Sequence, residues 1–211
     1  MTKVQPADPA LEAQVFWLRY RREIAALLVI AVVALTAFAG YRLYRDRRET
    51  AASAMMASAK TALDYQEIIN RYGDTSAAAA AYLLLADGQR KDRKFAEANA
   101  TLQRFIEKFP EHELVSTARM AIAANLESLG KQDEALAMYQ AVGSLNAGSF
   151  NAPHALLAQV QILEAKKRVE DARRICETIM TKYRDSYAAF EAARLLRTLK
   201  PAAQQNSSAR P

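Results

Sequence analysis

Residues 77–113 read AAAAAYLLLADGQRKDRKFAEANATLQRFIEKFPEHE and contain two apolar segments of helical length on either side of Lys91-Asp92-Arg93. Both segments are rich in Ala, Leu, Glu, Lys, Gln and Arg, which favour helix, and Phe109-Pro110 ends the second. Two short helices joined by a turn bury their apolar faces against each other and against neighbouring units. The stretch therefore predicts a helical hairpin.

The hairpin recurs along the chain with a period of 37 residues. Alanines align at two points of the repeat, as Ala98, Ala135 and Ala172 and as Ala81, Ala118, Ala155 and Ala192. A small side chain at a fixed point lets two helices approach closely, while a large neighbour fills the adjacent hole. The pattern predicts an all-α solenoid with a half-unit at about 50–72, three hairpins, and a closing helix at about 186–199.

The first hairpin resembles a tetratricopeptide repeat, whose consensus places large, small and aromatic residues at matching offsets. The matching residues of this unit are Tyr82, Leu85, Ala86, Phe95, Ala98, Leu102, Phe105 and Pro110. The second unit keeps Ile122, Ala123, Gly130, Ala135 and Tyr139. The third keeps Leu156, Val160, Ala172, Cys176 and Ile179 but lacks the Gly and the Pro.

An apolar run precedes the repeats. Residues Ile24 to Ala39 read IAALLVIAVVALTAFA, without a charge and with Thr36 as the only polar residue. Aromatic residues and arginines flank both ends, as they do at membrane interfaces, and we predict a transmembrane helix at 23–44. Two alternatives are a cleaved signal peptide, since Ala37-Phe38-Ala39 fits a cleavage site, and the buried core helix of a soluble protein.

Composition argues against most enzyme chemistry. The chain has one cysteine, two histidines and no Gly-rich phosphate loop, which predicts no cofactor, no metal, no catalytic residue and no small-molecule substrate. The net charge of +6 is split equally between the first 49 residues and the rest, so it is densest beside the apolar run. Arginines in that place favour membrane lipid over nucleic acid as the partner.

Stacked hairpins curve, and the first helix of each hairpin lines the concave side. Counted from the repeat consensus, this face is predicted to carry Leu83, Asp87, Arg90 and Lys91, then Met120, Ala124 and Glu127, then His154, Leu157, Gln161 and Glu164. We call these eleven residues the concave face. Such a face suits an extended peptide or a helix of a partner protein.

One apolar helix followed at once by divergent repeats resembles the ancillary SecYEG translocon subunit family over about residues 16–200. The stretch SLNAGSFNAPH at 144–154 is longer than that family's pattern. The resemblance implies a single-pass bacterial inner-membrane protein with a cytoplasmic tail at 1–22 and a periplasmic repeat domain at 45–200. The composition of residues 201–211, PAAQQNSSARP, predicts a disordered tail.

The same resemblance implies that translocon subunits or a periplasmic chaperone are the protein partners. The alternative function is an envelope or cell-division scaffold, either released by cleavage at Ala39 or facing the cytoplasm. Charge does not decide the orientation, because the two flanks of the apolar run carry similar numbers of basic residues.

Overall fold

The computed structural model describes residues 9–145 and 147–199, with side chains from residue 17 onward. Within these ranges the regular structure is helical, as the sequence predicts. The chain divides into two compact units, residues 1–51 and residues 52–211, and each is described by itself. The expected tail at 201–211 and residues 1–8 lie outside the described residues.

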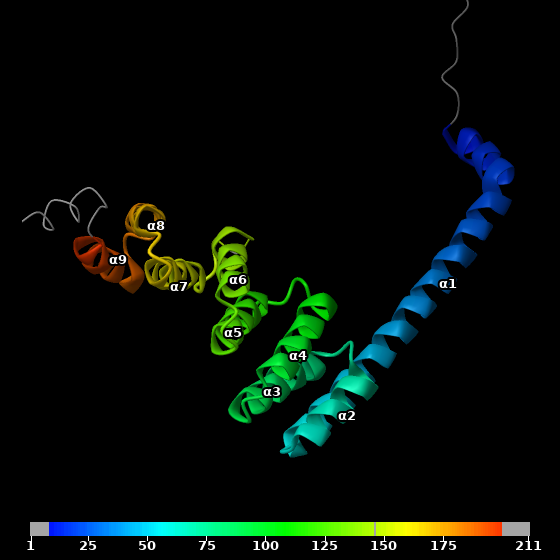
Figure 1. The fold of residues 1–211 in the computed structure, drawn as a ribbon. Helices are drawn as coiled ribbons and strands as arrows, with labels where there is room; N and C mark the ends of the chain where they lie inside the picture. The colour runs from blue at the N-terminus through cyan, green and yellow to red at the C-terminus, as the bar shows by residue number, and fades with distance from the viewer. Residues whose placement is uncertain (1–8, 146, 200–211) are drawn as a thin grey trace, which may run out of the picture. The chain divides into compact units, whose positions relative to one another are not determined.

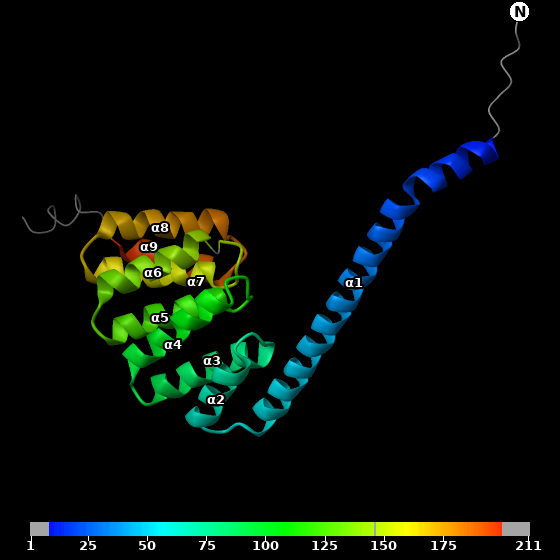
Figure 2. The same ribbon diagram turned by 90° about the vertical axis from the view of Figure 1, so that its right-hand side faces the viewer.

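The described helices follow the expected order. They are α1 (Pro9–Ser58), α2 (Ala62–Tyr72), α3 (Ser76–Lys91), α4 (Phe95–Lys108), α5 (Val115–Ser128), α6 (Gln132–Leu145), α7 (Ala152–Ala165), α8 (Val169–Lys182) and α9 (Tyr187–Thr198). Figures 1 and 2 show α3 to α8 as successive hairpins, followed by α9 beside α8. The three hairpins and the closing helix are confirmed.

The first unit is the long helix α1 up to residue 51. The helix extends beyond the expected span of 23–44 at both ends. Its apolar side chains are exposed, including Leu28, Val33 and Leu35, each at more than 60%. The hydroxyl of Thr36 donates to the carbonyl of Val32 at 2.9 Å, so the polar residue of the run is satisfied within its own helix.

This helix is long and apolar enough to cross a membrane. Its best 18-residue window has a mean hydropathy of 2.5, and none of that window is buried within the protein. A core helix of a soluble protein would be covered by its neighbours, so the exposure contradicts that alternative. A bilayer can cover such an apolar surface. The backbone of the helix needs no other partner there, because its N–H and C=O groups bond to one another.

The half-unit expected at about 50–72 would be a single helix in a stack of hairpins, but the structure divides this stretch into two helices. The end of α1 and α2 are separated at Ala59 to Thr61. Thr61 starts α2 with a capping box, in which its hydroxyl accepts from the Asp64 backbone N–H and the Asp64 carboxylate accepts from that of Thr61 at 2.8 Å. Hydrogen bonds from the backbone N–H of Lys60, which has the larger effect, and from that of Thr61 lower the pKa of the Asp64 carboxyl group.

The last turns of α1 belong to the second unit. Ala52 is fully buried, and Met55 and Met56 pack against a core cluster that contains Ile68 and Ile69 of α2. The half-unit is therefore a short hairpin made of the end of α1 and α2, which begins the stack.

The aligned alanines form the centre of the helix packing. All seven are at most 1% exposed: Ala81, Ala118, Ala155 and Ala192 on the first helices, and Ala98, Ala135 and Ala172 on the second. A further row at the same period, Ile68, Phe105, Val142 and Ile179, is also fully buried. In α4, α6 and α8, this large apolar residue lies seven positions, or about two helical turns, after the aligned alanine.

The turn inside each hairpin requires a residue with positive φ. Arg93, Gly130 and Lys167 occupy this place, spaced by 37 residues, with φ of 61°, 74° and 59°. The following backbone N–H bonds back to the carbonyl five residues earlier at 2.8 Å in all three turns, which is the Schellman geometry. Only one turn uses Gly, so Arg93 and Lys167 carry the cost of the left-handed conformation.

We expect opposite effects from Gly→Ala at two exposed positions. Gly130→Ala lowers the stability of the repeat domain by about 1 kcal/mol, because Ala resists positive φ. Gly88→Ala raises it by about 0.5–1 kcal/mol, because Gly88 lies within α3 and a Cβ there meets open space. Lys167→Gly relieves the strained turn and is stabilising. Urea unfolding followed by circular dichroism measures all three, and unchanged stability in Gly130→Ala contradicts the turn assignment.

A second test addresses the alanine rows. Ala135→Leu inserts a large side chain at a fully buried point of α6 and costs about 1–3 kcal/mol. Ala137→Leu is the matched control, because Ala137 is exposed on the same helix. Equal unfolding midpoints for the two variants would show that the alanine row does not control helix approach.

Candidate functional site

The eleven residues of the concave face lie on the first helices of the three hairpins. They occupy α3, α5 and α7, and three rows recur at the repeat period: Leu83, Met120 and Leu157; Asp87, Ala124 and Gln161; Arg90, Glu127 and Glu164. Equivalent positions on stacked helices form ladders across the units. Whether a partner binds to these ladders stays a prediction.

The apolar ladder is mostly part of the core. Leu157 is only 9% exposed, and Leu83 and Met120 are half-buried against the main core cluster. Leu157 therefore departs from the expected surface position, because it belongs to the main core cluster. The available surface is polar: Lys91, Glu127, Gln161 and Glu164 are exposed, and Asp87, Arg90, Ala124 and His154 are half-buried.

Charged residues at the α3 end of the face are already paired. The Lys91 ammonium lies 2.7 Å from the Asp87 carboxylate, one helical turn away. The hydrogen bond to Asp87 and its charge raise the pKa of Lys91. Both side chains are largely exposed, so the pair contributes little to stability and can exchange for groups of a partner.

A buried tyrosine connects two helices behind the face. The hydroxyl of Tyr139 on α6 donates to the Glu127 carboxylate on α5 at 2.5 Å. Burial first, and then this hydrogen bond, raise the pKa of Tyr139 well above its ordinary value of 10.0. The positive charge of Arg90 on α3 acts in the opposite direction. The bond holds the Glu127 side chain in place at the edge of the face.

The sequence analysis did not single out the polar contacts between neighbouring helices. The buried amide of Asn125 on α5 donates to Asn99 on α4 at 2.7 Å, and Thr101 on α4 donates to Gln89 on α3 at 2.8 Å. Gln159 is 2% exposed in the row where earlier units carry Leu85 and Ile122. The sequence does contain a signal for Gln159, because alignment at the 37-residue period places it with the apolar Leu85 and Ile122.

The comparison with known families agrees with this architecture. The family described as tetratricopeptide repeat-like domain matches residues 14–174. The chain belongs to that family. The search of curated proteins found no match.

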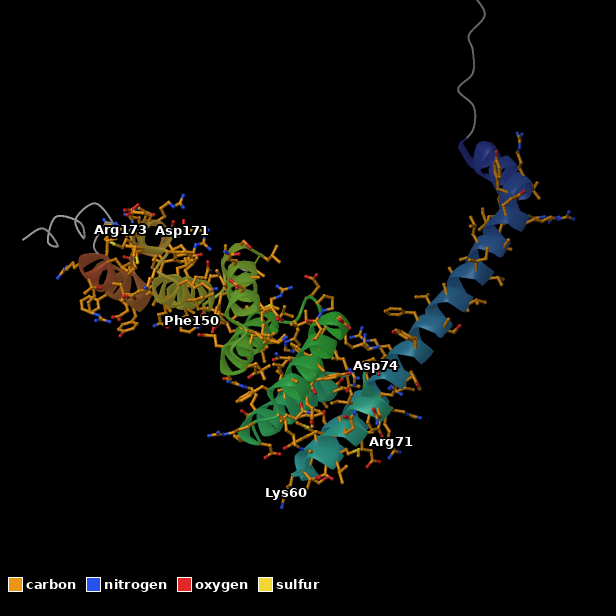
Figure 3. All side chains as sticks on the ribbon, viewed as in Figure 1. Lys60, Arg71, Asp74, Phe150, Asp171 and Arg173 are labelled. Carbon is orange, nitrogen blue, oxygen red and sulfur yellow. The ribbon has the colours of Figure 1, made fainter. Side chains whose placement is uncertain are left out.

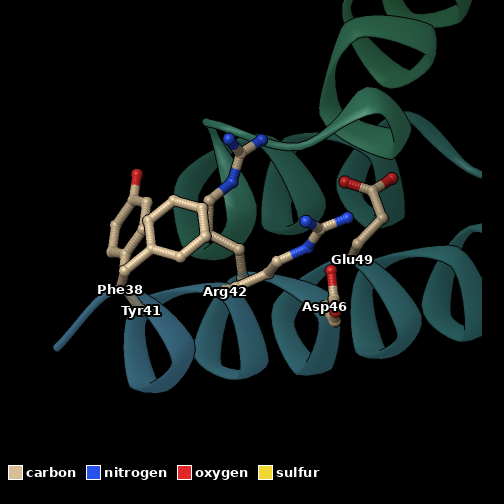
Figure 4. Close-up of a pocket in the computed structure, with 6 residues that line it drawn as sticks. Phe38, Tyr41, Arg42, Asp46 and Glu49 are labelled. Atoms are coloured by element: carbon tan, nitrogen blue, oxygen red, sulfur yellow. The ribbon is translucent and has the colours of Figure 1, made fainter. Parts of the chain in front are cut away.

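The matched tetratricopeptide repeat-like region includes the apolar part of α1 as well as α2 to α7. Where α1 leaves its apolar run, a pocket is lined by Phe38, Tyr41, Arg42, Arg45, Asp46 and Glu49 (Figure 4). Their spacing of three or four residues places them on one helical face. Aromatic and arginine side chains in this place match the interface between hydrocarbon and water.

The other chemically reactive side chains of the repeats have structural places. Cys176 is fully buried on α8, and burial raises the pKa of its thiol to about 11, which keeps it protonated and unreactive at neutral pH. The His112 ring packs edge-on against Phe105 at 5.3 Å, and its Nδ1 accepts the backbone N–H of Leu114. Among the described residues, His, Cys, Asp and Glu form no group of three that could hold a metal ion.

The Tyr139–Glu127 bond makes stability depend on pH. Because folding raises the pKa of Tyr139 above 10.0, its contribution is complete below pH 10.0 and decreases as the pH rises towards the higher pKa of the folded protein. Tyr139→Phe is expected to cost about 1.5–3 kcal/mol at neutral pH, and the difference from the wild type shrinks above pH 10.0. Urea midpoints across pH measure it.

Tyr187→Phe is the control, because Tyr187 is 70% exposed. A difference between the Tyr139→Phe variant and the wild type that stays constant through alkaline pH would disprove the coupling.

Proposed function

We propose that the chain is a membrane-tethered scaffold that binds other proteins through its repeat domain and is not an enzyme. The observation that carries this proposal is the family match over residues 14–174, which covers the exposed apolar helix and the repeats together. Tetratricopeptide-type arrays present a rigid concave surface to peptides and helices of other proteins. Tethering such a surface to a membrane raises its effective concentration near membrane partners.

The concave face is the proposed binding surface. Its accessible residues come from α3, α5 and α7. The residues of α3 carry both charges, at Asp87, Arg90 and Lys91. Those at the end of α7 are the polar Gln161 and the acidic Glu164. The apolar ladder behind them is mostly buried, so specificity would come from polar contacts and from the half-buried Leu83 and Met120. An extended peptide suits this combination, because its backbone can bond to polar side chains while its own side chains enter shallow apolar sites.

For the identity of the partner, we propose the secretion translocon or a periplasmic chaperone that handles emerging chains. The support is the resemblance in organisation to the ancillary SecYEG translocon subunit family, with one apolar helix directly followed by divergent repeats. In this proposal α1 crosses the inner membrane once and the repeats face the periplasm. The arginines and aromatic residues after the apolar run then lie at the membrane surface.

The test is affinity purification of the full-length tagged chain from gently solubilised membranes, with quantification of translocon subunits and chaperones. The triple variant Lys91→Ala, Gln161→Ala, Glu164→Ala removes exposed side chains of the concave face. The matched control is Gln103→Ala, Gln140→Ala, Glu177→Ala, three exposed residues at one repeat position of the second helices. We expect the first variant to lose most of the recovered partner and the control to keep it.

Recovery of these partners with equal yield from both variants would remove the concave face as their site. Absence of any translocon subunit or chaperone from the wild-type sample would remove the proposed partners and leave the general scaffold. Protease treatment of spheroplasts, with a C-terminal tag, tests the orientation: digestion without lysis supports the periplasmic arrangement, and protection until lysis supports a cytoplasmic scaffold. A mature protein that starts at Gly40 supports the released alternative.

A further inference from the structure

The last helix, α9, has an exposed side that is covered in every earlier first helix. In α3, Ala78, Ala81 and Leu85 belong to the core cluster with Ile68 and Ile69 of the preceding α2. Ala79 and Ala86 belong instead to the cluster with Leu102 and Phe105 of the following α4. Each first helix thus has a backward side and a forward side, and the forward side packs on its own second helix.

On α9, the repeat period assigns Phe190, Ala193, Arg194 and Arg197 to the forward side, and we call these four residues the open side of α9. Phe190 is 69% exposed, whereas its equivalents Ala79, Ser116 and Pro153 are buried. Arg197 is exposed where the earlier helices bury Ala86, Ala123 and Val160. In Figure 1, α9 follows α8 at the end of the described chain, with no helix beyond it.

Residues 200–211 read KPAAQQNSSARP and do not have the composition of a second helix. They contain two prolines and no Leu, Ile, Val, Met or aromatic residue, whereas α4, α6 and α8 each bury at least one such side chain. This composition differs from that of the second helices that cover the forward sides of α3, α5 and α7.

The open side is held rigidly in place. The Arg173 guanidinium on α8 donates to the carbonyl of Leu199 at 2.6 Å and to that of Leu196 at 3.4 Å, which satisfies the end of α9. Figure 3 shows Arg173 at this end of the repeat domain. Ser186 caps the start of α9 by accepting the backbone N–H of Ala189. A helix fixed at both ends presents its side chains without a large entropic cost on binding.

The charge of the open side is basic. Arg194 is paired with Glu191 on the same helix, and this pairing lowers the pKa of Glu191. Arg197 is exposed and has no ion pair among the described residues. Earlier first helices carry Leu83, Met120 and Leu157 at the place of Arg194, so the basic character is particular to α9. An acidic partner complements this surface, and a basic one is repelled.

We propose that the open side of α9 binds an acidic amphipathic helix of a partner protein, which packs where a fourth second helix would lie. In this proposal, small residues of the partner helix pack against Phe190, at the place where a second helix would carry its aligned alanine. Carboxylates of the partner helix face Arg194 and Arg197. This surface continues the concave face at Arg194, which stands at the place of Leu157, and adds Phe190 and Arg197, whose equivalents in the earlier first helices are buried.

The test uses a defined peptide and the full-length chain in zwitterionic lipid nanodiscs. The parent peptide is residues 169–182, the sequence of α8, with Cys176→Ala and a side-chain staple on its outer face to keep it helical. The acidic peptide has in addition Arg173→Glu, Arg174→Glu and Lys182→Glu. Fluorescence anisotropy of the labelled peptides gives the two dissociation constants. We expect the acidic peptide to bind at least about tenfold more tightly than its parent.

Two pairs of variants locate the binding site. Phe190→Ala and Arg197→Glu are each expected to weaken binding of the acidic peptide by about tenfold or more. The matched controls are Leu63→Ala, which removes a side chain 82% exposed near the other end of the repeats, and Arg104→Glu on the exposed surface of α4. These controls are expected to bind as the wild type does. Thermal unfolding of each variant verifies that it is folded.

The proposal is overturned if both peptides bind equally, or if Phe190→Ala and Arg197→Glu bind the acidic peptide as tightly as the controls do. A Trp probe distinguishes a membrane surface from a helix: Phe190→Trp is placed in a Trp17→Phe background, because Trp17 is the one tryptophan of the sequence. A blue shift of its emission on adding acidic peptide supports the proposal. A blue shift on changing only to anionic nanodiscs assigns the open side to lipid and overturns it.

Discussion

The close approach of neighbouring helices at buried alanines is the constraint on which the repeat domain depends. Seven alanines in two rows have almost no exposed surface. Each second helix also buries one large apolar residue, and this residue recurs at the repeat period. A protein interior tolerates neither voids nor extra atoms at such points. The 37-residue spacing is therefore a packing requirement, because moving one alanine by a single position would turn it away from its partner helix.

Features that arise from regular packing were predictable from the sequence. The end of α4 follows from the break at Phe109-Pro110, and α9 lies within one residue of the expected closing helix. The separation of α1 from α2 was missed, because Ala59-Lys60-Thr61 contains neither Gly nor Pro. The capping box of Thr61 and Asp64 was the available signal there.

The candidate site was less predictable than the fold. A helix position can be placed on the concave face by its register, but its exposure depends on how deep the neighbouring helix lies. Leu157 is buried for this reason, while Glu164 of the same helix is exposed. Contacts between helices, such as Tyr139 with Glu127 within one hairpin and Asn125 with Asn99 between two hairpins, join residues at different repeat positions. A periodic pattern specifies which residues are equivalent, and it does not specify which unlike residues meet.

Departures from the repeat therefore mark the functional candidates. Inside the array, an apolar residue at a repeated position is covered by the next helix and has a structural reason to be there. At the end of the array that cover is missing, and a terminal helix is expected to carry polar residues on its outer side. Arg194 and Arg197 of α9 follow that rule, whereas Phe190 and Tyr187, each about 70% exposed, do not. Solubility alone would favour polar residues at both places, and the proposed partner helix would cover Phe190 beside the two arginines.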